Sequence, residues 1–256
     1  MSAPALQAIA LSKSFGGVRA AADVSFAVAP ETLTAIIGPN GAGKTTLFNL
    51  ITNLLPADAG EVRYFGTRLT GLTAAAIAAR GLIRTFQSAR IFPGMTALEN
   101  VLAGAHLHVR AGAAAQMLWL PAARAEERDL AARASALLEL AGLERQGDAP
   151  ANVLAIGAQK MLEVIRALMA RPRMMLLDEP AAGLNDAETA DLGALLRAVR
   201  AAGVTVIVVE HNMSLVMGVA DQVIVLDAGS IVAAGTPGEI QRDPRVVAAY
   251  VGAEIA

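Results

Sequence analysis

Residues 38–45 constrain the fold more than any other part of this sequence. They follow a short β-branched apolar run at residues 33–37 and precede an apolar helical pattern over residues 44–55 that ends before Pro56. The segment fits the pattern G-x-x-x-x-G-K-[ST], in which glycines let the backbone wrap closely round a phosphate group and the start of a helix faces the anion. The sequence therefore predicts a strand, a phosphate-binding loop and a helix, in this order.

The predicted loop carries the groups that a nucleoside triphosphate and its metal ion require. Lys44 is expected to pair with the β- and γ-phosphates, and Thr45 is expected to hold Mg²⁺ through its hydroxyl. Backbone N–H groups along the loop supply further donors. The residues predicted to bind nucleotide here are Gly38, Pro39, Asn40, Gly41, Ala42, Gly43, Lys44, Thr45 and Thr46.

Two carboxylates and a histidine follow later apolar runs. The run over residues 174–177 ends in Asp178 and Glu179, so a buried strand there delivers Asp178 to Mg²⁺ and places Glu179 to polarise an attacking water. His211 comes shortly after the apolar run 204–209 and can reach the γ-phosphate with its imidazole. These side chains are the predicted metal ligand, general base and phosphate contact.

The residue pattern along the chain changes twice, and its order predicts an α/β fold. It reads as β-rich up to residue 87, as alanine- and leucine-rich helix from there to residue 154, and then as alternating helices and strands, which favour a mainly parallel sheet. Further predicted elements are short strands at 6–11 and 24–28, an edge strand at 61–65, a strand at 82–86, helices at 122–140, 159–171, 187–202 and about 244–251, and a hairpin at 227–230.

Composition narrows the class of protein further. The chain has 256 residues, enough for one α/β domain with an inserted lobe. Its 21 basic and 23 acidic residues leave a net charge of -2, too balanced for a nucleic-acid surface, so no nucleic-acid partner is expected. It has no cysteine, no secretory signal and no apolar stretch of the roughly 18 residues that a membrane span needs. We expect a cytoplasmic protein that reaches a membrane only through a protein partner.

The order of these motifs resembles the ATP-binding subunits of ABC transporters over nearly the whole chain. Phe15 is similar to the aromatic residue that stacks on adenine, and Gln87 to the glutamine that contacts Mg²⁺ and the membrane partner. Residues 181–185 resemble the loop that communicates across a dimer, and His211 matches the switch histidine. The resemblance implies ATP and Mg²⁺ as ligands, with Gln87 joining Glu179 and His211 among the catalytic groups.

The resemblance also implies the fold in more detail. It predicts a P-loop ABC cassette with a mainly parallel core sheet, an antiparallel β subdomain and an inserted helical subdomain. The predicted division is a nucleotide-binding core of residues 1–87 and 158–236, a helical subdomain of residues 88–157 and a C-terminal helical tail of residues 237–256.

The signature of this family, usually L-S-G-G-Q, is only partly kept. Residues 154–158 read L-A-I-G-A, so Leu154 and Gly157 agree, whereas Ala155 lacks the serine hydroxyl that touches the γ-phosphate of the other subunit. Backbone N–H groups around Gly157 and the next helix start can still face that phosphate. Leu154, Ala155 and Gly157 are therefore predicted to complete the nucleotide site of a second subunit.

Local features resemble one of the two ATPases of the branched-chain amino acid importers, notably residues 81–87, 119–121, 210–217 and 235–252. This resemblance implies a second ATPase subunit, either identical or a related paralogue, together with integral membrane permease subunits and, indirectly, a solute-binding protein. The chain is then expected at the inner face of the cell membrane. An ATPase for another cargo, such as urea or lipopolysaccharide, stays open as an alternative. A soluble ABC ATPase is a weaker one, because the chain shows neither a second cassette nor a long coiled-coil insertion.

Two smaller features of the sequence are an apolar cluster and a pair of histidines. Ile91, Phe92, Pro93 and Met95 form an apolar cluster, which belongs either to the core of the helical subdomain or to a groove that docks a short permease helix. His106 and His108 form an H-x-H pair without cysteine or acidic residues at ligand spacing, so a solvated pair is predicted rather than a metal site.

Overall fold

The computed structural model describes residues 3–85, 91–109, 112, 117–118 and 120–253, with the side chains of residues 250–253 left aside. The chain divides into two compact units. The first comprises Met1–Arg84, Arg173–Ala182 and Leu196–Ala256, and the second comprises Thr85–Pro172 and Gly183–Leu195. The domain boundaries expected from the sequence stay a prediction.

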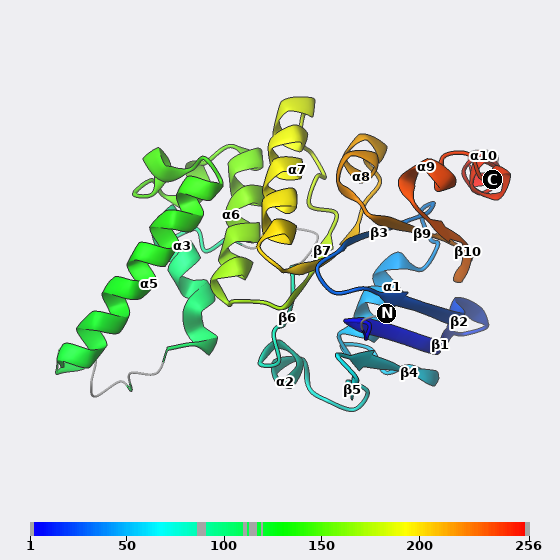
Figure 1. Cartoon of the computed structure of the whole chain (residues 1–256), viewed down its shortest axis with the longest axis horizontal. Helices are drawn as coiled ribbons and strands as arrows, with labels where there is room; N and C mark the ends of the chain where they lie inside the picture. Colours follow the sequence, from blue (N-terminus) through cyan, green and yellow to red (C-terminus); the bar gives the residue numbers. More distant parts are fainter. Residues whose placement is uncertain (1–2, 86–90, 110–111, 113–116, 119, 254–256) are drawn as a thin grey trace. The chain divides into compact units, whose positions relative to one another are not determined.

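A six-stranded sheet forms the centre of the first unit (Figure 1). Its strands, in spatial order, are β10 (Ser230–Gly235), β9 (Gln222–Asp227), β3 (Leu33–Ile37), β8 (Thr205–Val209), β7 (Met174–Asp178) and β6 (Leu82–Arg84). Neighbours are parallel except for β9 and β10, which form the predicted hairpin. Every residue of β3, β7 and β8 is buried, as expected for parallel strands covered on both faces. The mainly parallel core sheet is confirmed.

A second, antiparallel sheet has the order β2–β1–β4–β5, formed by β1 (Leu6–Phe15), β2 (Val18–Val28), β4 (Ala59–Tyr64) and β5 (Thr67–Arg68). β1 and β2 extend beyond their predicted lengths, because shifts in pairing and positive φ angles at Ala10 and Asp23 interrupt the alternation of side chains that the prediction followed. The strand predicted at residues 61–65 is confirmed as β4, but its predicted place at the edge of the sheet was wrong. β4 lies between β1 and β5, since the chain turns back after Tyr64 and adds the short β5.

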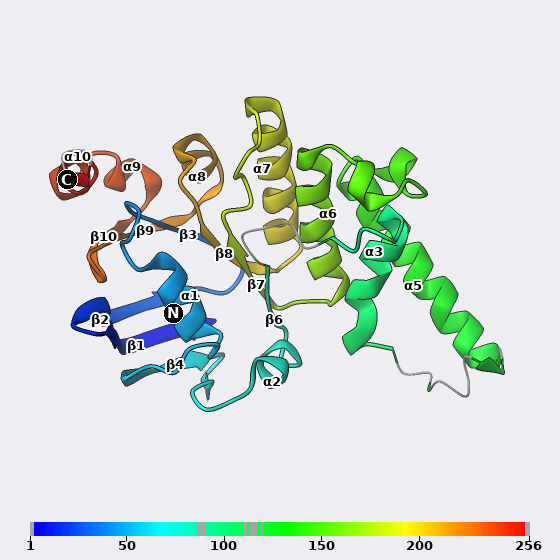
Figure 2. The ribbon, with the colours of Figure 1, turned by 180° about the vertical axis from the view of Figure 1, so that it is seen from behind.

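Helix α1 (Lys44–Ile51) lies between the two sheets of the first unit (Figure 2). Leu47, Phe48 and Ile51 are fully buried, and each such side chain stabilises the fold by about 1.5–3 kcal/mol. The helix ends before the predicted residue 55 because Asn53 adopts a positive φ of 52°. The loop of residues 38–45 is thereby attached to a helix whose far end is held in the core.

The second unit is helical. α3 (Ala97–Ala103), α5 (Pro121–Leu140) and α6 (Ile156–Met169) pack against one another, and the unit includes the first part of α7 (Asp186–Ala201). α5 begins at the predicted Pro121, whereas α6 begins three residues before its predicted start. Ala155, the residue before α6, has no side-chain capping bond, so the sequence carried no capping signal there. The described residues of this unit also form 3₁₀ turns at Gly104–Leu107, Glu144–Gln146 and Ala151–Val153.

The remaining helices of the first unit are α2 (Ala74–Ala78), α8 (Met213–Val219), α9 (Pro237–Ile240) and α10 (Pro244–Ala253). α7 and α10 confirm the helices predicted at residues 187–202 and about 244–251. Within the described part of the chain, no helix combines the length and the apolar character that crossing a bilayer requires.

Candidate active site

The loop of residues 38–45 connects β3 with α1, and two of its glycines are required by packing. Gly38 and Gly43 have φ angles of +151° and +98°, and a Cβ atom would lie 2.0 Å from the Leu226 carbonyl oxygen at Gly38 and 2.2 Å from the Ala20 carbonyl oxygen at Gly43. Backbone atoms cannot yield as a flexible side chain can, so only glycine fits at these positions. Close contact with the surrounding strands therefore shapes the loop.

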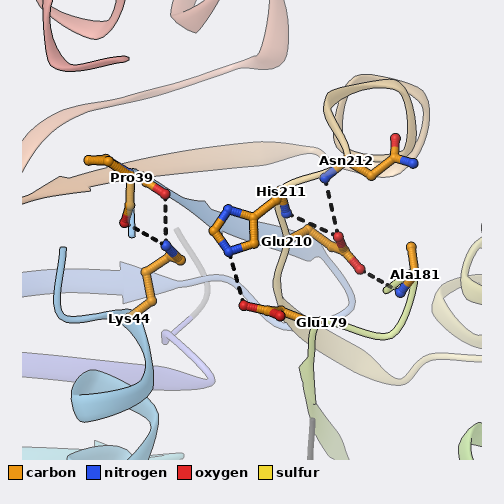
Figure 3. A network of polar contacts seen from close by, with 8 residues as sticks. Pro39, Lys44, Glu179, Ala181, Glu210, His211 and Asn212 are labelled. Carbon is orange, nitrogen blue, oxygen red and sulfur yellow. Dashed lines mark hydrogen bonds and ion pairs between the residues drawn. The ribbon is translucent and has the colours of Figure 1, made fainter. Parts of the chain in front are cut away.

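Lys44 is the first residue of α1 and is only 6% exposed. Its Nζ donates to the carbonyl oxygens of Gly38 and Pro39, at 2.7 and 2.9 Å (Figure 3). Burial lowers the pKa of Lys44, while Glu179 and Asp178 act on it in the opposite direction. The ammonium thus lies within the loop and within electrostatic reach of both predicted carboxylates.

Asp178 ends β7 and is buried. Its Oδ2 accepts a hydrogen bond of 2.9 Å from Nη2 of Arg84, the last residue of β6. Thr45 and Thr46 lie in the first turn of α1, where Thr45 is exposed. Since β3, β7 and β8 are parallel neighbours, the residues that follow them meet at one edge of the sheet, which is where open α/β sheets bind ligands.

Glu179 and His211 are in direct contact at that edge. His211 Nε2 lies 2.9 Å from Glu179 Oε1 (Figure 3). The Glu179 N–H donates to the Val209 carbonyl oxygen at 2.9 Å, which joins the ends of β7 and β8. Glu179 has a positive φ of 48°, a conformation that costs a non-glycine residue about 1–3 kcal/mol. The predicted base and the predicted histidine thus form one pair.

Glu210 is a component of the site that sequence reasoning missed. It is 2% exposed, and its carboxylate accepts hydrogen bonds from the N–H groups of Ala181 (2.6 Å), His211 (3.0 Å) and Asn212 (3.3 Å). Burial raises the pKa of Glu210 and the Glu179 carboxylate adds to this rise, whereas the backbone donors oppose it. Glu210 therefore connects the turn after Glu179 with the turn that carries His211. The only sequence signal for it is its position directly after an apolar strand.

The other predicted residues lie elsewhere or are not described. Phe15 is exposed at the end of β1, with Lys13 Nζ 5.8 Å from its ring centre. Gln87 lies outside the described residues. Leu154, Ala155 and Gly157 belong to the second unit.

The signature segment shows a contact that the sequence does not reveal. Gly157 is buried in the first turn of α6, and a Cβ atom there would lie 2.4 Å from Glu188 Oε1. Glu188 Oε2 accepts a 3.0 Å hydrogen bond from the Asn185 N–H, and the Glu188 N–H donates to Asn185 Oδ1 at 3.0 Å. These reciprocal bonds cap the start of α7. Glu188 thus connects the signature glycine with the loop of residues 181–185.

The apolar segment of residues 91–95 is held by its backbone. Asn100 is fully buried, accepts from the Phe92 N–H at 2.8 Å and donates to the Phe92 carbonyl oxygen at 3.1 Å. The side chains of Phe92 and Met95 are 47% and 40% exposed. Both members of the H-x-H pair, His106 and His108, are exposed, and the described residues contain no group of three His, Cys, Asp or Glu residues that could hold a metal ion.

The fold and this site define the ATP-binding cassette of ABC transporters. The chain matches the family described as "ABC transporter" over residues 21–182, and the family described as "Branched-chain amino acid ATP-binding cassette transporter" over residues 230–256. It belongs to the ATP-binding proteins of ABC transporters, and to their branched-chain amino acid group. The predicted family, its ABC cassette fold and its ATP-hydrolysing activity in transport are thereby confirmed.

Individual relatives agree with this membership. The chain is 42% identical over 253 residues to the high-affinity branched-chain amino acid transport ATP-binding protein BraF of Pseudomonas aeruginosa, covering 98% of this chain and 99% of BraF. A crystal structure of the ADP conformation of an ABC transporter cassette has a TM-score of 0.85 and 33% identity, covering 98% of this chain and 100% of that one. A dimeric cassette bound to ADP and Pi has a TM-score of 0.76 and 26% identity, covering 91% and 98% of the two chains.

Proposed function

We propose that this subunit powers the import of branched-chain or other hydrophobic amino acids through separate integral membrane permease subunits. The similarity to BraF and the family match at residues 230–256 support this cargo. The subunit then works at the cytoplasmic face of the membrane, and a solute-binding protein delivers the cargo to the permease. Uptake of leucine and of urea by vesicles containing the assembled transporter tests the cargo, because uptake of urea alone would contradict it.

The proposed chemistry rests chiefly on the pairing of Glu179 with His211 beside Lys44. Glu179 acts as the general base: its carboxylate accepts a hydrogen bond from the attacking water and polarises it towards the γ-phosphate. His211 orients that carboxylate through the 2.9 Å contact and supplies a second polar group next to the γ-phosphate. Glu210 acts one step away, since it holds the backbone of His211 and of Ala181.

Lys44 binds the β- and γ-phosphates in this proposal. Its ammonium already lies against the loop, bonded to two neutral carbonyl oxygens. Phosphate oxygens carry negative charge and make stronger, charge-assisted hydrogen bonds, so nucleotide binding replaces weaker acceptors by better ones. The backbone of residues 38–46 supplies the remaining donors, and Phe15 offers its exposed ring to the adenine.

The residues at the loop also fit a magnesium ion. The Thr45 hydroxyl and the Asp178 carboxylate are hard oxygen ligands of the kind that Mg²⁺ prefers, and we propose Gln87 as a third contact. When bound, Mg²⁺ would offset the negative charge that develops on the phosphate groups. In this chain, Asp178 and Thr45 have the task of holding the ion and fixing its place relative to Lys44.

We further propose that the working unit contains two cassettes, with a second copy of this chain or a related paralogue as partner. The loop of residues 38–45 and the strand ends supply one side of a nucleotide site. Leu154, Ala155 and Gly157 of the second subunit supply the other side, and the existence of a dimeric relative supports this arrangement.

The variant Glu179→Gln tests the proposed chemistry. The amide keeps the size of the side chain but is a poor base, so ATP should still bind while hydrolysis falls by about 10²–10⁴-fold. Glu61→Gln, in a carboxylate paired with Arg63 on the surface, is the matched control and should hydrolyse ATP normally. Wild-type turnover by Glu179→Gln would assign the base to another residue, with His211 the next candidate.

A further inference from the structure

Arg84, at the end of β6, is a buried arginine that contacts two other elements of the first unit, β7 and α1. Its side chain is 8% exposed and that of its partner Asp178 is 5% exposed. Nη2 donates to Asp178 Oδ2 at 2.9 Å, while Nη1 donates to Asn49 Oδ1 at 2.7 Å and lies 3.3 Å from Thr52 Oγ1. The planar guanidinium thus spans the end of β7 and helix α1 from its own position at the end of β6.

The contacts on α1 lie on a defined face of the helix. Thr45, Asn49 and Thr52 are spaced by four and three residues, and residues at this spacing share one side of a helix. Arg84 donates hydrogen bonds to Asn49 and Thr52, so it contacts the face of α1 that also carries Thr45. The same guanidinium holds Asp178. Two of the proposed Mg²⁺ ligands, Asp178 and Thr45, are therefore positioned by one side chain, Asp178 directly and Thr45 through α1.

We propose that Arg84 is a positioning residue for the magnesium site. It sets Asp178 and the Thr45 face of α1 at the separation that the ion requires, and it fixes the orientation of the carboxylate through the 2.9 Å bond to Oδ2. That bond engages Oδ2, and a carboxylate has a second oxygen that can serve a ligand. This inference rests on the proposed roles of Thr45 and Asp178.

Lysine cannot replace arginine in this task. An ammonium keeps the charge, but it is a compact donor that cannot reach a carboxylate and two groups on α1 with the geometry of a planar fork. Arg84→Lys should therefore keep a counter-charge for Asp178 while losing the fixed distance between β7 and α1. A role confined to stability would appear as a lower Tm without any change in the dependence on Mg²⁺.

The binding of ADP reports how much Mg²⁺ each variant requires, without any hydrolysis step. ADP binding is followed by calorimetry while Mg²⁺ is titrated, and again in EDTA. For Arg84→Lys, the half-saturating Mg²⁺ concentration should rise about tenfold or more, the effect typical of residues that orient metal ligands, while ADP affinity in EDTA stays within about twofold. Arg80→Lys, an exposed arginine that bonds only the Ala76 carbonyl oxygen among the described residues, is the control and should match the wild type.

A second variant separates positioning from charge. Asn49→Ala removes one anchor on α1 and leaves the ion pair with Asp178, so it should also raise the half-saturating Mg²⁺ concentration, by less than Arg84→Lys. An unchanged Mg²⁺ dependence in both variants, or a lower Mg²⁺ requirement in Arg84→Lys, would overturn the inference. If wild-type ADP binding did not respond to Mg²⁺ at all, the proposed metal site itself would be wrong.

Discussion

Lys44 lies in a nearly closed environment, where the carbonyl oxygens of Gly38 and Pro39 accept hydrogen bonds from its Nζ. Burial lowers the pKa of Lys44, and the carboxylates of Glu179 and Asp178 oppose this effect. Lys44→Ala removes the charge that the phosphates need, and hydrogen bonds to charged groups contribute roughly 1.5–3 kcal/mol each. ATP affinity should therefore fall by at least about tenfold, as measured by equilibrium binding of a fluorescent ATP analogue. Arg63→Ala removes an exposed cation instead and should bind like the wild type. Normal binding by Lys44→Ala would exclude the proposed phosphate-binding loop.

Glu210 makes stability depend on pH in a direction that the structure defines. Its pKa is raised, so the folded state binds the proton more tightly than the unfolded chain. Its contribution to the free energy of unfolding is thus largest below the ordinary pKa of 4.5 and is lost as pH rises through the raised value. Glutamine does not titrate, so Glu210→Gln should gain stability relative to the wild type as pH rises from about 4 towards 7.

Urea unfolding at several pH values measures this effect, and Glu239 provides a control of opposite sign. Hydrogen bonds from Thr236 lower the pKa of Glu239, so its stabilisation is present above pH 4.5 and is lost at lower pH. Glu239→Gln should therefore lose stability relative to the wild type as pH rises. Parallel trends in the two variants would contradict the assigned direction at Glu210.

The residues of the site differ in whether their bonding partners can be predicted from the neighbouring sequence. Lys44 lies within a local motif whose spacing specifies its partners, because Lys44 bonds carbonyl groups five and six residues away. In contrast, Arg84 bonds to Asp178, which is 94 residues away in the sequence. Glu210 bonds to Ala181, which is 29 residues away. Such partners depend on strand order in the sheet, which no local pattern contains. The loop could therefore be predicted from the sequence, whereas the contacts of Arg84 and Glu210 around it could not.

Among the elements, the parallel strands were the easiest to predict and the small sheet the hardest. β3, β7 and β8 are buried along their full length and read as continuous apolar runs. β1 and β2 have mixed burial and shifts in pairing, so the positions of their ends could not be predicted from the sequence. The start of α6 was hidden as well, because no capping side chain marks it. Element boundaries depend on such local bonds more than on apolar periodicity.

The segment of residues 91–95 leads to a prediction at the level of one element. Because Asn100 fixes its backbone while the ring of Phe92 stays half exposed, the segment fits a docking surface better than a core. Phe92→Ser should leave Tm within a few degrees of the wild type and keep ATP binding, yet abolish co-purification with the permease. The ring's contact with the Arg166 guanidinium, 5.3 Å from its centre, contributes only about 0.5–1 kcal/mol at such a site.

Leu54→Ser is the matched control for this experiment, because Leu54 is a similarly exposed apolar residue of the first unit. It should fold and co-purify normally. If Phe92→Ser failed to fold, the segment would belong to the core of its unit, and the docking proposal would be wrong.

At the scale of the whole molecule, the order of motifs identified the class of protein. The loop of residues 38–45, the pair Asp178 and Glu179, and His211 each come after a predicted strand. The division into two compact units is less accessible to sequence. The second unit includes Gly183–Leu195 and so takes in the start of α7, which the chain reaches only after returning to the central sheet. Contacts such as that of Glu188 with Gly157 bring these distant segments together.

That contact bears on whether hydrolysis needs two cassettes. The proposed trans contact comes from backbone N–H groups near Gly157, since Ala155 offers no hydroxyl, so Ala155→Ser should change turnover only modestly. Gly157→Asp should bind ATP but hydrolyse it poorly. However, the Cβ atom of an aspartate at position 157 would lie 2.4 Å from Glu188 Oε1 of its own subunit, so the two side chains overlap and their like charges repel.

The experiment therefore compares Gly157→Asp alone with Gly157→Asp in a Glu188→Ala background, where both the overlap and the repulsion are removed. If the second subunit's signature segment contacts the γ-phosphate, both should remain slow, because a side chain with negative charge still faces the nucleotide. The wild-type rate per subunit should rise with protein concentration, with the partner ATPase added where one exists, as dimers form. Recovery of full turnover in the double variant would assign the defect to the clash within one subunit. A rate per subunit that stays constant down to dilute monomer would show that one chain contains the complete site.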